Sequence, residues 1–264
     1  VKPKMVGDSD ANESLTKPIN KWQSYSLVLS HILVIVVACL VVGWASMSSD
    51  SGGLGGLQGG APFSWHPVCM VFGLIICFTE AMLSYRSFPL GKAANKIIHL
   101  TLQTVAIVFL GTGLWAVFKA HNENLYANLY SSHSWLGLTT IVLFVPQWVG
   151  GLVAFVSKSA PSAEAKKAYL PLHILVGLLT YLCAVLAVET GLSENSAFSS
   201  CGYSVSTPDK NPASHWHLVS PGCKAANALA ITVVALALCA LATVIDIHPK
   251  DTKERLAQSS GEKE

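Results

Sequence analysis

The stretch "NLYSSHSWLGLTTIVLFVPQWVGGLVAFV", residues 128–156, decides the fold, because a polar segment turns within it into a long apolar one. After His133, no acidic or basic side chain occurs until Lys158. A helix of about 20 apolar residues crosses the ~30 Å hydrocarbon core of a bilayer. The stretch therefore predicts a membrane-spanning helix over residues 134–156, with a titratable imidazole at its mouth.

The composition of the whole chain also indicates a membrane protein. Of its 264 residues, 52% are hydrophobic and only 12% are charged, whereas a soluble domain carries about 25% charged residues. Five further apolar runs are long enough to span a bilayer, without the alternation of a membrane β-barrel; they are 26–47, 65–85, 97–118, 170–192 and 225–247. We therefore predict an all-α membrane protein with six transmembrane helices.

The distribution of Lys and Arg predicts the orientation, because cytosolic loops carry an excess of both. Only Lys119, Lys210 and Lys224 fall on one side of the predicted spans, which leaves 14 of the 17 basic residues on the other side. Both termini are therefore expected in the cytosol, as tails 1–25 and 248–264 around a membrane domain of residues 26–247. A net charge of only +2 gives no reason to expect a nucleic-acid partner.

Two of the outer loops carry further signals. The segment "DSGGLGGLQGGAP" (50–62) has no GK[ST] and follows no strand, so we interpret it as a connector and not as a phosphate-binding loop. Cys201 and Cys223 are the only cysteines outside the predicted spans, and both lie in the loop 193–224. On the oxidising side of a membrane they are expected to form a disulfide, the alternative being two free thiols.

Four of the nine histidines share one kind of position, at the start of a predicted span: His66, His99, His133 and His173. Successive spans alternate in direction, so His66 and His133 fall near the outer face and the other two near the cytosolic face. Two imidazoles at one depth suit a flat group held between them, such as a haem whose iron binds two histidines. With both axial positions filled, electron transfer is the expected task. His31 also lies near the cytosolic face, and spacing alone does not exclude it as a ligand.

Glycines recur near these histidines. Gly137 and Gly177 follow His133 and His173 by four residues, and Gly73 follows His66 by seven, on the same helical face. A missing side chain there leaves room for the edge of a porphyrin. The alternative is that small residues permit close packing of membrane helices.

Six segments of the chain resemble the cytochrome b561 family of transmembrane ascorbate-dependent oxidoreductases: "HPVCMVFGLI" (66–75), "EAMLSYR" (80–86), "KAANKIIHLTLQ" (92–103), "NLYSSHSWLG" (128–137), "LPLHILVG" (170–177) and "GLSE" (191–194). The resemblance implies that helices 2–5 form a four-helix core binding two b-type haems. It pairs His66 with His133 on the outer side and His99 with His173 on the cytosolic side, and it leaves His31 out of the ligand set.

The resemblance also implies roles for polar residues around each haem. The cytosolic haem and ascorbate, an anion, would be contacted by Arg86, Lys92, Lys96 and Lys166. The outer haem would lie near Asn128, Leu129, Tyr130, Ser131 and Glu194, with His121 and Tyr130 lining the acceptor pocket. Relatives often carry Arg where this chain has Lys166, and a Lys there lacks the planar fork that binds a carboxylate-like group with two hydrogen bonds.

The resulting hypothesis is that electrons pass from cytosolic ascorbate through two haems to monodehydroascorbate or a ferric chelate on the other side. The alternatives are a haem-bearing anchor that serves a partner protein and a transporter whose histidines relay protons or bind zinc. The sequence leaves the oligomeric state open, a homodimer being one of the assemblies considered. A vesicle, a lysosome or vacuole and the plasma membrane all remain open as locations. Glu189, His31 and the segment 215–217 ("HWH") receive no role.

Overall fold

The computed structural model describes residues 20–57, 62–87, 90–157, 161–199, 201 and 217–245. The regular elements in these ranges are helices: α2 (Lys21–Ser46), η1 (Ser49–Ser51), η2 (Pro62–Ser64), α3 (Trp65–Met70), the π-helix η3 (Val71–Cys77), α4 (Phe78–Ser87), α5 (Lys92–Asn124), α6 (Ser132–Phe155), α7 (Ala163–Phe198) and α8 (Pro221–Val244). Six of the helical segments are long and apolar enough to cross a membrane, with η2, α3, η3 and α4 joined as one. The predicted all-α architecture with six spans is therefore confirmed.

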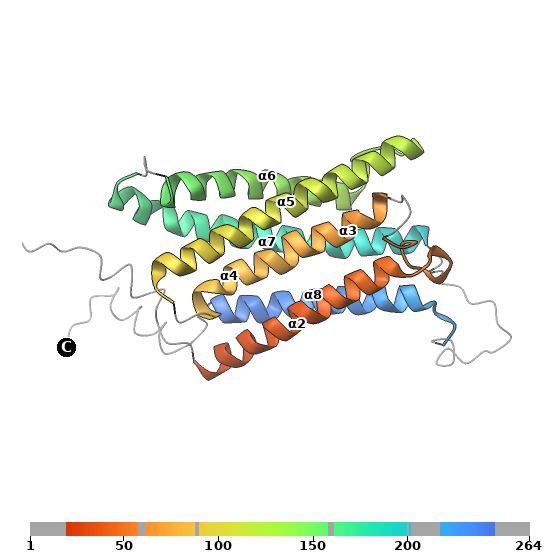
Figure 1. Ribbon diagram of the computed structural model, residues 1–264, viewed down its shortest axis with the longest axis horizontal. Helices are drawn as coiled ribbons and strands as arrows, with labels where there is room; N and C mark the ends of the chain where they lie inside the picture. Colours follow the sequence, from red (N-terminus) through yellow and green to blue (C-terminus); the bar gives the residue numbers. More distant parts are fainter. Residues whose placement is uncertain are drawn as a thin grey trace, which may run out of the picture.

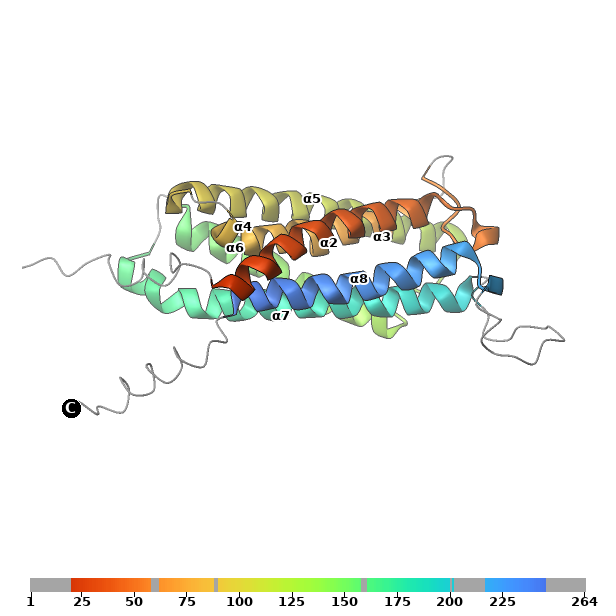
Figure 2. The same cartoon turned by 90° about the horizontal axis from the view of Figure 1, so that it is seen from below.

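The six spans run up and down as a bundle, as Figures 1 and 2 show from two directions. Three pairs pack along their lengths: α2 with α8, the α3–η3–α4 span with α5, and α6 with α7. We call the end with the connections after α2, α5 and α7 the outer end, and the end with the connections after α4 and α6 the inner end. These names follow the predicted orientation.

Several helices begin and end outside the predicted apolar runs, because capping and polar turns extend them. α2 begins at Lys21 and not at residue 26, since the Asn20 side chain accepts from the Gln23 backbone and the Gln23 side chain accepts from the Asn20 backbone. α5 runs on to Asn124, and α7 covers 163–198 where hydropathy indicated 170–192. The extra turns are polar, so hydropathy could not find them. Most of the two predicted tails lies outside the described residues.

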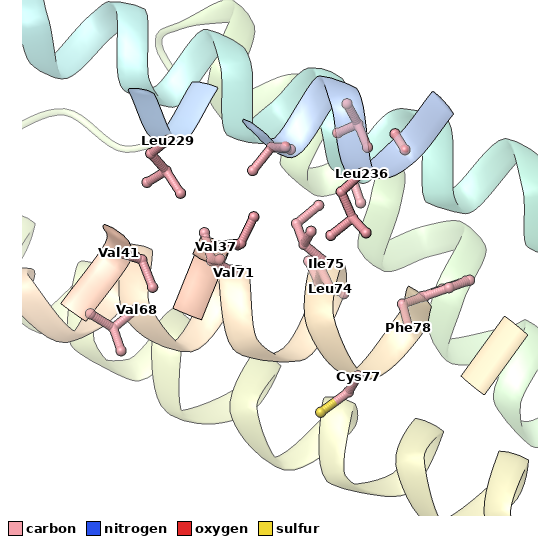
Figure 3. Packing of buried hydrophobic residues seen from close by; sticks show 14 of the residues in the cluster. Val37, Val41, Val68, Val71, Leu74, Ile75, Cys77, Phe78, Leu229 and Leu236 are labelled. Carbon is pink, nitrogen blue, oxygen red and sulfur yellow. The ribbon is translucent and has the colours of Figure 1, made fainter. Parts of the chain in front are cut away.

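The α3–η3–α4 span lies at the centre of the bundle. In its most apolar 18-residue window 72% of the residues are buried, against 33% or less in the other five spans. Figure 3 shows Ile75 of this span facing Leu236 of α8, within one cluster of buried apolar residues that also contains Leu74 and Phe78. Because lipid tails are as apolar as these side chains, close packing and not escape from water holds the contact.

Gly73 belongs to this packing. A Cβ on Gly73 would lie 2.9 Å from Phe109 Cβ and 3.0 Å from the Ala106 carbonyl oxygen, both on α5. The glycine is therefore needed for the close approach of η3 to α5. The interpretation of Gly73 as room for a porphyrin was wrong, and the alternative of close helix packing holds at this position.

Candidate functional site

The four histidines that begin spans meet as two pairs, one at each end of the bundle. At the outer end the rings of His66 (α3) and His133 (α6) lie 6.0 Å apart between centroids. At the inner end the rings of His99 (α5) and His173 (α7) lie 6.5 Å apart. Each histidine pair therefore connects two sets of packed spans. One set is the α3–η3–α4 span with α5, and the other is α6 with α7. Each pair contains two histidines that the sequence places at the same depth, and the pairs are those that the family resemblance implied.

Backbone carbonyls orient three of the four rings through Nδ1: His66 with Gly113 (3.0 Å), His99 with Ala81 (2.8 Å) and His133 with Ala187 (2.8 Å). A carbonyl oxygen only accepts, so Nδ1 of each ring carries the proton. The neutral ring then presents the lone pair on Nε2, which is the atom a metal would bind. A ligating histidine characteristically donates its other ring N–H in this way.

His173 is held differently. Its Nδ1 is buried and has no hydrogen-bond partner among the described residues. Its ring contacts Phe155 and Tyr169, with centroids 5.5 and 5.9 Å away, and its backbone oxygen accepts from the Gln147 side chain. Packing between aromatic rings therefore orients this imidazole in place of a carbonyl acceptor.

Two glycines on partner helices make space for the rings. A Cβ on Gly191 of α7 would lie 2.8 Å from Cε1 and Nδ1 of His133, and one on Gly151 of α6 would lie 3.2 Å from Cε1 of His173. Both distances are shorter than ordinary contacts, so an alanine would displace the imidazole. Gly137 has no atom within 4 Å of an added Cβ. The sequence-based interpretation of Gly137 as room for a porphyrin edge stays a prediction.

The geometry of each pair fits a metal held between two imidazoles inside a macrocycle. Two metal–nitrogen bonds of about 2 Å and two ring radii of about 1 Å put the centroids about 6 Å apart, as in both pairs. No group of three or more His, Cys, Asp or Glu side chains able to hold a metal occurs in the described part of the chain. The remaining ligands would therefore come from a bound group. A porphyrin supplies four nitrogens in one plane, so the residues present fit a haem.

Cationic side chains of the predicted donor site cluster at the inner end. Lys96 is half-buried, and its Nζ donates to the Phe155 carbonyl oxygen at 3.0 Å. Phe155 itself contacts the His173 ring, so Lys96 lies one residue away from the inner pair. Lys166 and Arg86 are also half-buried, whereas Lys92 is exposed at the start of α5. The aromatic ring of Tyr85 lies 5.7 Å from His99.

Polar residues of the predicted acceptor site meet at the outer end. The Tyr130 hydroxyl donates to Glu194 Oε1 at 2.5 Å, and this hydrogen bond, together with slight burial and the carboxylate charge, raises the pKa of Tyr130. His121 Nδ1 lies 3.0 Å from Asn128 Oδ1, so that this pair closes the loop between α5 and α6. Leu129 has a left-handed backbone with φ of 56°.

The other outer-end residues that the sequence analysis named lie in different surroundings. Ser131 caps α6 by accepting from the Ser134 backbone. Cys201 and Cys223 are joined in a disulfide that ties the residues after α7 to the first turn of α8. Glu189 Oε1 is buried and has no hydrogen-bond partner within the described ranges. His217 is exposed, and residues 215–216 lie outside the described residues.

One polar cluster was not foreseen. His31 Nδ1 of α2 lies 2.9 Å from Glu80 Oε1 of α4, and His31 Nε2 lies 3.1 Å from Ser87 Oγ. Ser87 Oγ donates its single proton to the Leu83 carbonyl, so Nε2 must be the donor toward Ser87. The signal available in the sequence was Glu80 itself, since a carboxyl group within a span needs a partner at the same depth.

The chain is similar to known proteins over the part that contains these residues. The family model of eukaryotic cytochrome b561 matches residues 65–199, a range that contains all four paired histidines. A probable ascorbate-specific transmembrane electron transporter of Oryza sativa subsp. japonica is 39% identical over 171 residues, which are 64% of this chain and 73% of the relative.

Two ferrireductases are similarly related. A transmembrane ascorbate ferrireductase of Arabidopsis thaliana is 38% identical over 172 residues, which are 64% of this chain and 71% of the relative. A lysosomal membrane ascorbate-dependent ferrireductase of Danio rerio is 33% identical over 216 residues, which are 79% of this chain and 83% of the relative.

Proposed function

We propose, because this chain belongs to the eukaryotic cytochrome b561 family, that it carries electrons across a membrane from ascorbate to an acceptor on the opposite side. The observation that carries the proposal is the pair of imidazoles at each end of the bundle, 6.0 and 6.5 Å apart. Relatives named for ascorbate-dependent electron transport and ferrireduction support it. The inner end, where the basic residues gather, would face the cytosol.

Each histidine pair would hold one b haem, His66 with His133 at the outer end and His99 with His173 at the inner end. A haem bound by two histidines stores one electron and leaves no iron position open for oxygen. The chain's own contribution is orientation. Three Nδ1–H groups are fixed by carbonyls, which leaves the Nε2 lone pair of those three rings for a metal, and the fourth ring is held by aromatic packing.

The donor site would lie at the inner end. Ascorbate is an anion at neutral pH, and it loses one electron and one proton to become monodehydroascorbate. Lys96 and Lys166 supply positive charge near the inner pair, with Arg86 and Lys92 beside them. Lys96 is held against the Phe155 carbonyl, so its ammonium group is positioned before the anion arrives.

The acceptor site would lie at the outer end, near Tyr130, His121 and Asn128. Monodehydroascorbate takes up one electron and one proton to become ascorbate, whereas a ferric chelate takes up the electron alone. With Nδ1 of His121 directed at Asn128 Oδ1, its Nε2 is left to accept a proton and pass it to the acceptor.

An absorption spectrum of the purified protein tests this function. We expect a Soret band that sharpens when ascorbate is added, and two haems per chain by pyridine haemochrome assay. His133→Ala should remove the outer haem and leave an inner haem that ascorbate still reduces. A colourless chain that cannot be reconstituted with haem would contradict the proposal, and loss of ascorbate reduction in His133→Ala would invert the proposed topology.

The donor site has a matched pair of variants. Lys96→Met should slow haem reduction by ascorbate about tenfold, because it removes a half-buried charge held near His173. Lys92→Met, which removes an exposed charge one helical turn away, should slow it about twofold. Stopped-flow absorbance measures both rates, and reduction by dithionite is the control. Equal slowing with dithionite would mean that the variant had lost haem and not the ascorbate site.

A further inference from the structure

The outer end contains a cavity that neither the histidine pair nor the Tyr130 loop accounts for. It has a volume of about 520 Å³ and is lined by residues of the 48–54 loop, η2 and the end of α7: Ser49, Asp50, Gly53, Leu54, Phe63, Asn195, Phe198 and Ser199. Sites for small ligands commonly measure about 300–1,000 Å³. The cavity is therefore large enough for a small molecule or a complexed metal ion.

Phe63 connects this cavity to the outer histidine pair. Its ring is stacked on the ring of His66, with centroids 6.2 Å apart and an interplanar angle of 28°. His66 is in turn one of the two proposed ligands of the outer haem. A molecule in the cavity is thus separated from that ligand by a single aromatic ring.

The walls of the cavity are fixed by hydrogen bonds and packing. Trp44 Nε1 donates to the Gly52 carbonyl at 3.1 Å, and Ser64 Oγ donates to the Leu54 carbonyl at 2.7 Å. A Cβ on Gly52 would lie 2.8 Å from Cys223 Sγ, so the loop rests directly on the disulfide that also ties down the end of α7. The described wall of the cavity, which is wide open to its surroundings, is therefore held by contacts within the fold.

The electrostatics of the lining favour a cation. Asp50 is the one ionisable residue of the lining, and it has no ion-pair partner in the part of the chain that the structure describes. Asn195, Phe198 and Ser199 stand at the C-terminus of α7, where the free carbonyls of the last turn act as about half a negative charge. An anion such as monodehydroascorbate would meet repulsion here, and a positively charged acceptor would meet attraction.

Two polar side chains of the lining are available to hydrogen-bond a ligand. The Ser49 hydroxyl and the Asn195 amide make no side-chain hydrogen bond to described residues. Carboxylate, amide and hydroxyl groups are hydrogen-bond partners for the ligands of a metal complex and, in the case of oxygen, for the metal itself. Phe63 and Phe198 provide apolar surface beside them.

We propose that this cavity, the Asp50 cavity, is an exit for electrons at the outer end and takes a small cationic metal complex, with Asp50 as its charged contact and Phe63 as its link to His66. The inference rests on the proposed function, which supplies the electron. The step is an outer-sphere transfer. One electron leaves the reduced protein, the acceptor's trivalent metal ion becomes divalent, no bond forms or breaks and no proton moves.

Two small octahedral acceptors of opposite charge test the proposal: hexaammineruthenium(III), with charge +3, and hexacyanoferrate(III), with charge −3. The haem-loaded protein is reduced with ascorbate, and its reoxidation by each acceptor is followed by stopped-flow absorbance at low ionic strength. The variants are Asp50→Asn and Asp50→Lys. Each rate is expressed relative to the wild type with the same acceptor, so that differences in driving force between the acceptors cancel.

We expect Asp50→Asn to slow reoxidation by the ruthenium complex about fivefold and Asp50→Lys to slow it more than about tenfold. Reoxidation by hexacyanoferrate should be unchanged or faster, and both effects should fade at high salt. Glu123→Gln is the matched control, because Glu123 is an exposed carboxylate at the same end of the bundle and outside the cavity. It makes the same change in net charge and should leave both rates within about twofold.

A binding measurement separates this inference from the proposed function. Hexaamminecobalt(III), which is reduced only slowly, is titrated by calorimetry into oxidised protein. Saturable binding that Asp50→Asn weakens about fivefold, and Glu123→Gln does not, supports the site without any electron transfer. A wild type that shows no haem band contradicts the proposed function, while the titration still reports on the cavity. Rates and binding that respond to Asp50→Asn no more than to Glu123→Gln overturn the Asp50 cavity as an exit.

Discussion

At the scale of single residues, three of the four paired histidines are oriented by backbone carbonyls on other helices. The carbonyl of Ala187 on α7 orients His133 of α6, and the carbonyl of Ala81 on α4 orients His99 of α5. They fix which nitrogen is free, and hence whether the ring can act as a ligand at all.

Gly191 offers a test of this positioning. Gly191→Ala places a methyl group 2.8 Å from the His133 ring, so we expect the outer haem content to fall by more than about half, in line with the tight packing of protein interiors. The inner haem should stay loaded and reducible by ascorbate. Haem content per chain and the two low-spin electron paramagnetic resonance signals measure the outcome.

The control for that variant lies on α5. Gly111→Ala adds the same methyl group where no atom lies within 4 Å, and it should leave both haem signals intact. Loss of both haems in Gly191→Ala would indicate general misfolding. Full retention of the outer haem would mean that the His133 ring can move without consequence.

Glycine spacing illustrates how far the sequence leads at this scale. Spacing along the sequence relates each histidine only to residues of its own helix, where Gly137 and Gly177 lie four residues after His133 and His173. Gly191 and Gly151, which touch the rings, belong to the partner helices. Which residues of two helices face each other depends on their relative rotation and height, and no local pattern encodes that. The histidines themselves could be predicted, because depth in a bilayer follows directly from position in an apolar run.

At the scale of elements, the outer connections are tied to one another more firmly than loops alone would be. The disulfide joins Cys201, just after α7, to Cys223 in α8, and the 48–54 loop packs against it through Gly52. Three spans, α2, α7 and α8, are thereby linked next to the outer histidine pair. Sequence reasoning identified the two cysteines from topology, but the segment 50–62, which overlaps this loop, was interpreted only as a connector.

Replacing the disulfide should therefore loosen the outer end. The bridge closes a segment with a sequence separation of 22 residues, for which the chain-entropy model gives about 3 kcal/mol. We expect Cys201→Ser together with Cys223→Ser to lower the midpoint of thermal unfolding in detergent by several degrees, and to release the outer haem before the inner one.

Cys39→Ser is the control, because Cys39 is a free, exposed cysteine on α2. It should unfold like the wild type, and treatment with a reductant should reproduce the double variant only in chains that retain the bridge. An unfolding midpoint insensitive both to reductant and to the double substitution would show that packing alone holds the outer end.

At the scale of the whole molecule, the bundle divides into a four-span part that carries both histidine pairs and an α2–α8 pair beside it. The family match of residues 65–199 covers the first part and leaves out α2 and α8. The two parts nevertheless share one apolar core, in which Val37 and Leu229 pack with Ile75. They also share the His31–Glu80 contact near the inner end. Hydropathy predicted all six spans, but it could not predict which of them form the centre, because each is apolar enough to face lipid.

Vectorial electron transfer is the property that only the whole molecule can have. We expect protein reconstituted in sealed vesicles, with hexacyanoferrate(III) trapped inside and ascorbate added outside, to reduce the trapped acceptor in the fraction of molecules whose inner end faces out. His133→Ala and His173→Ala should each reduce that rate by more than about tenfold, because either change leaves only one histidine pair to carry electrons across a hydrocarbon core about 30 Å thick. Loss of trapped hexacyanoferrate absorbance measures the rate, and vesicles without protein give the leak.

The two variants should differ in what remains, and that difference makes the experiment decisive. In His133→Ala the surviving pair is at the inner end, so externally added ascorbate should still produce a reduced haem spectrum without consuming the trapped acceptor. In His173→Ala the surviving pair is at the outer end, away from Lys96 and Lys166. Externally added ascorbate should therefore reduce the remaining haem slowly. Undiminished consumption of the trapped acceptor in either variant would show that one pair suffices to cross the membrane, and a path through two haems in series would then be wrong.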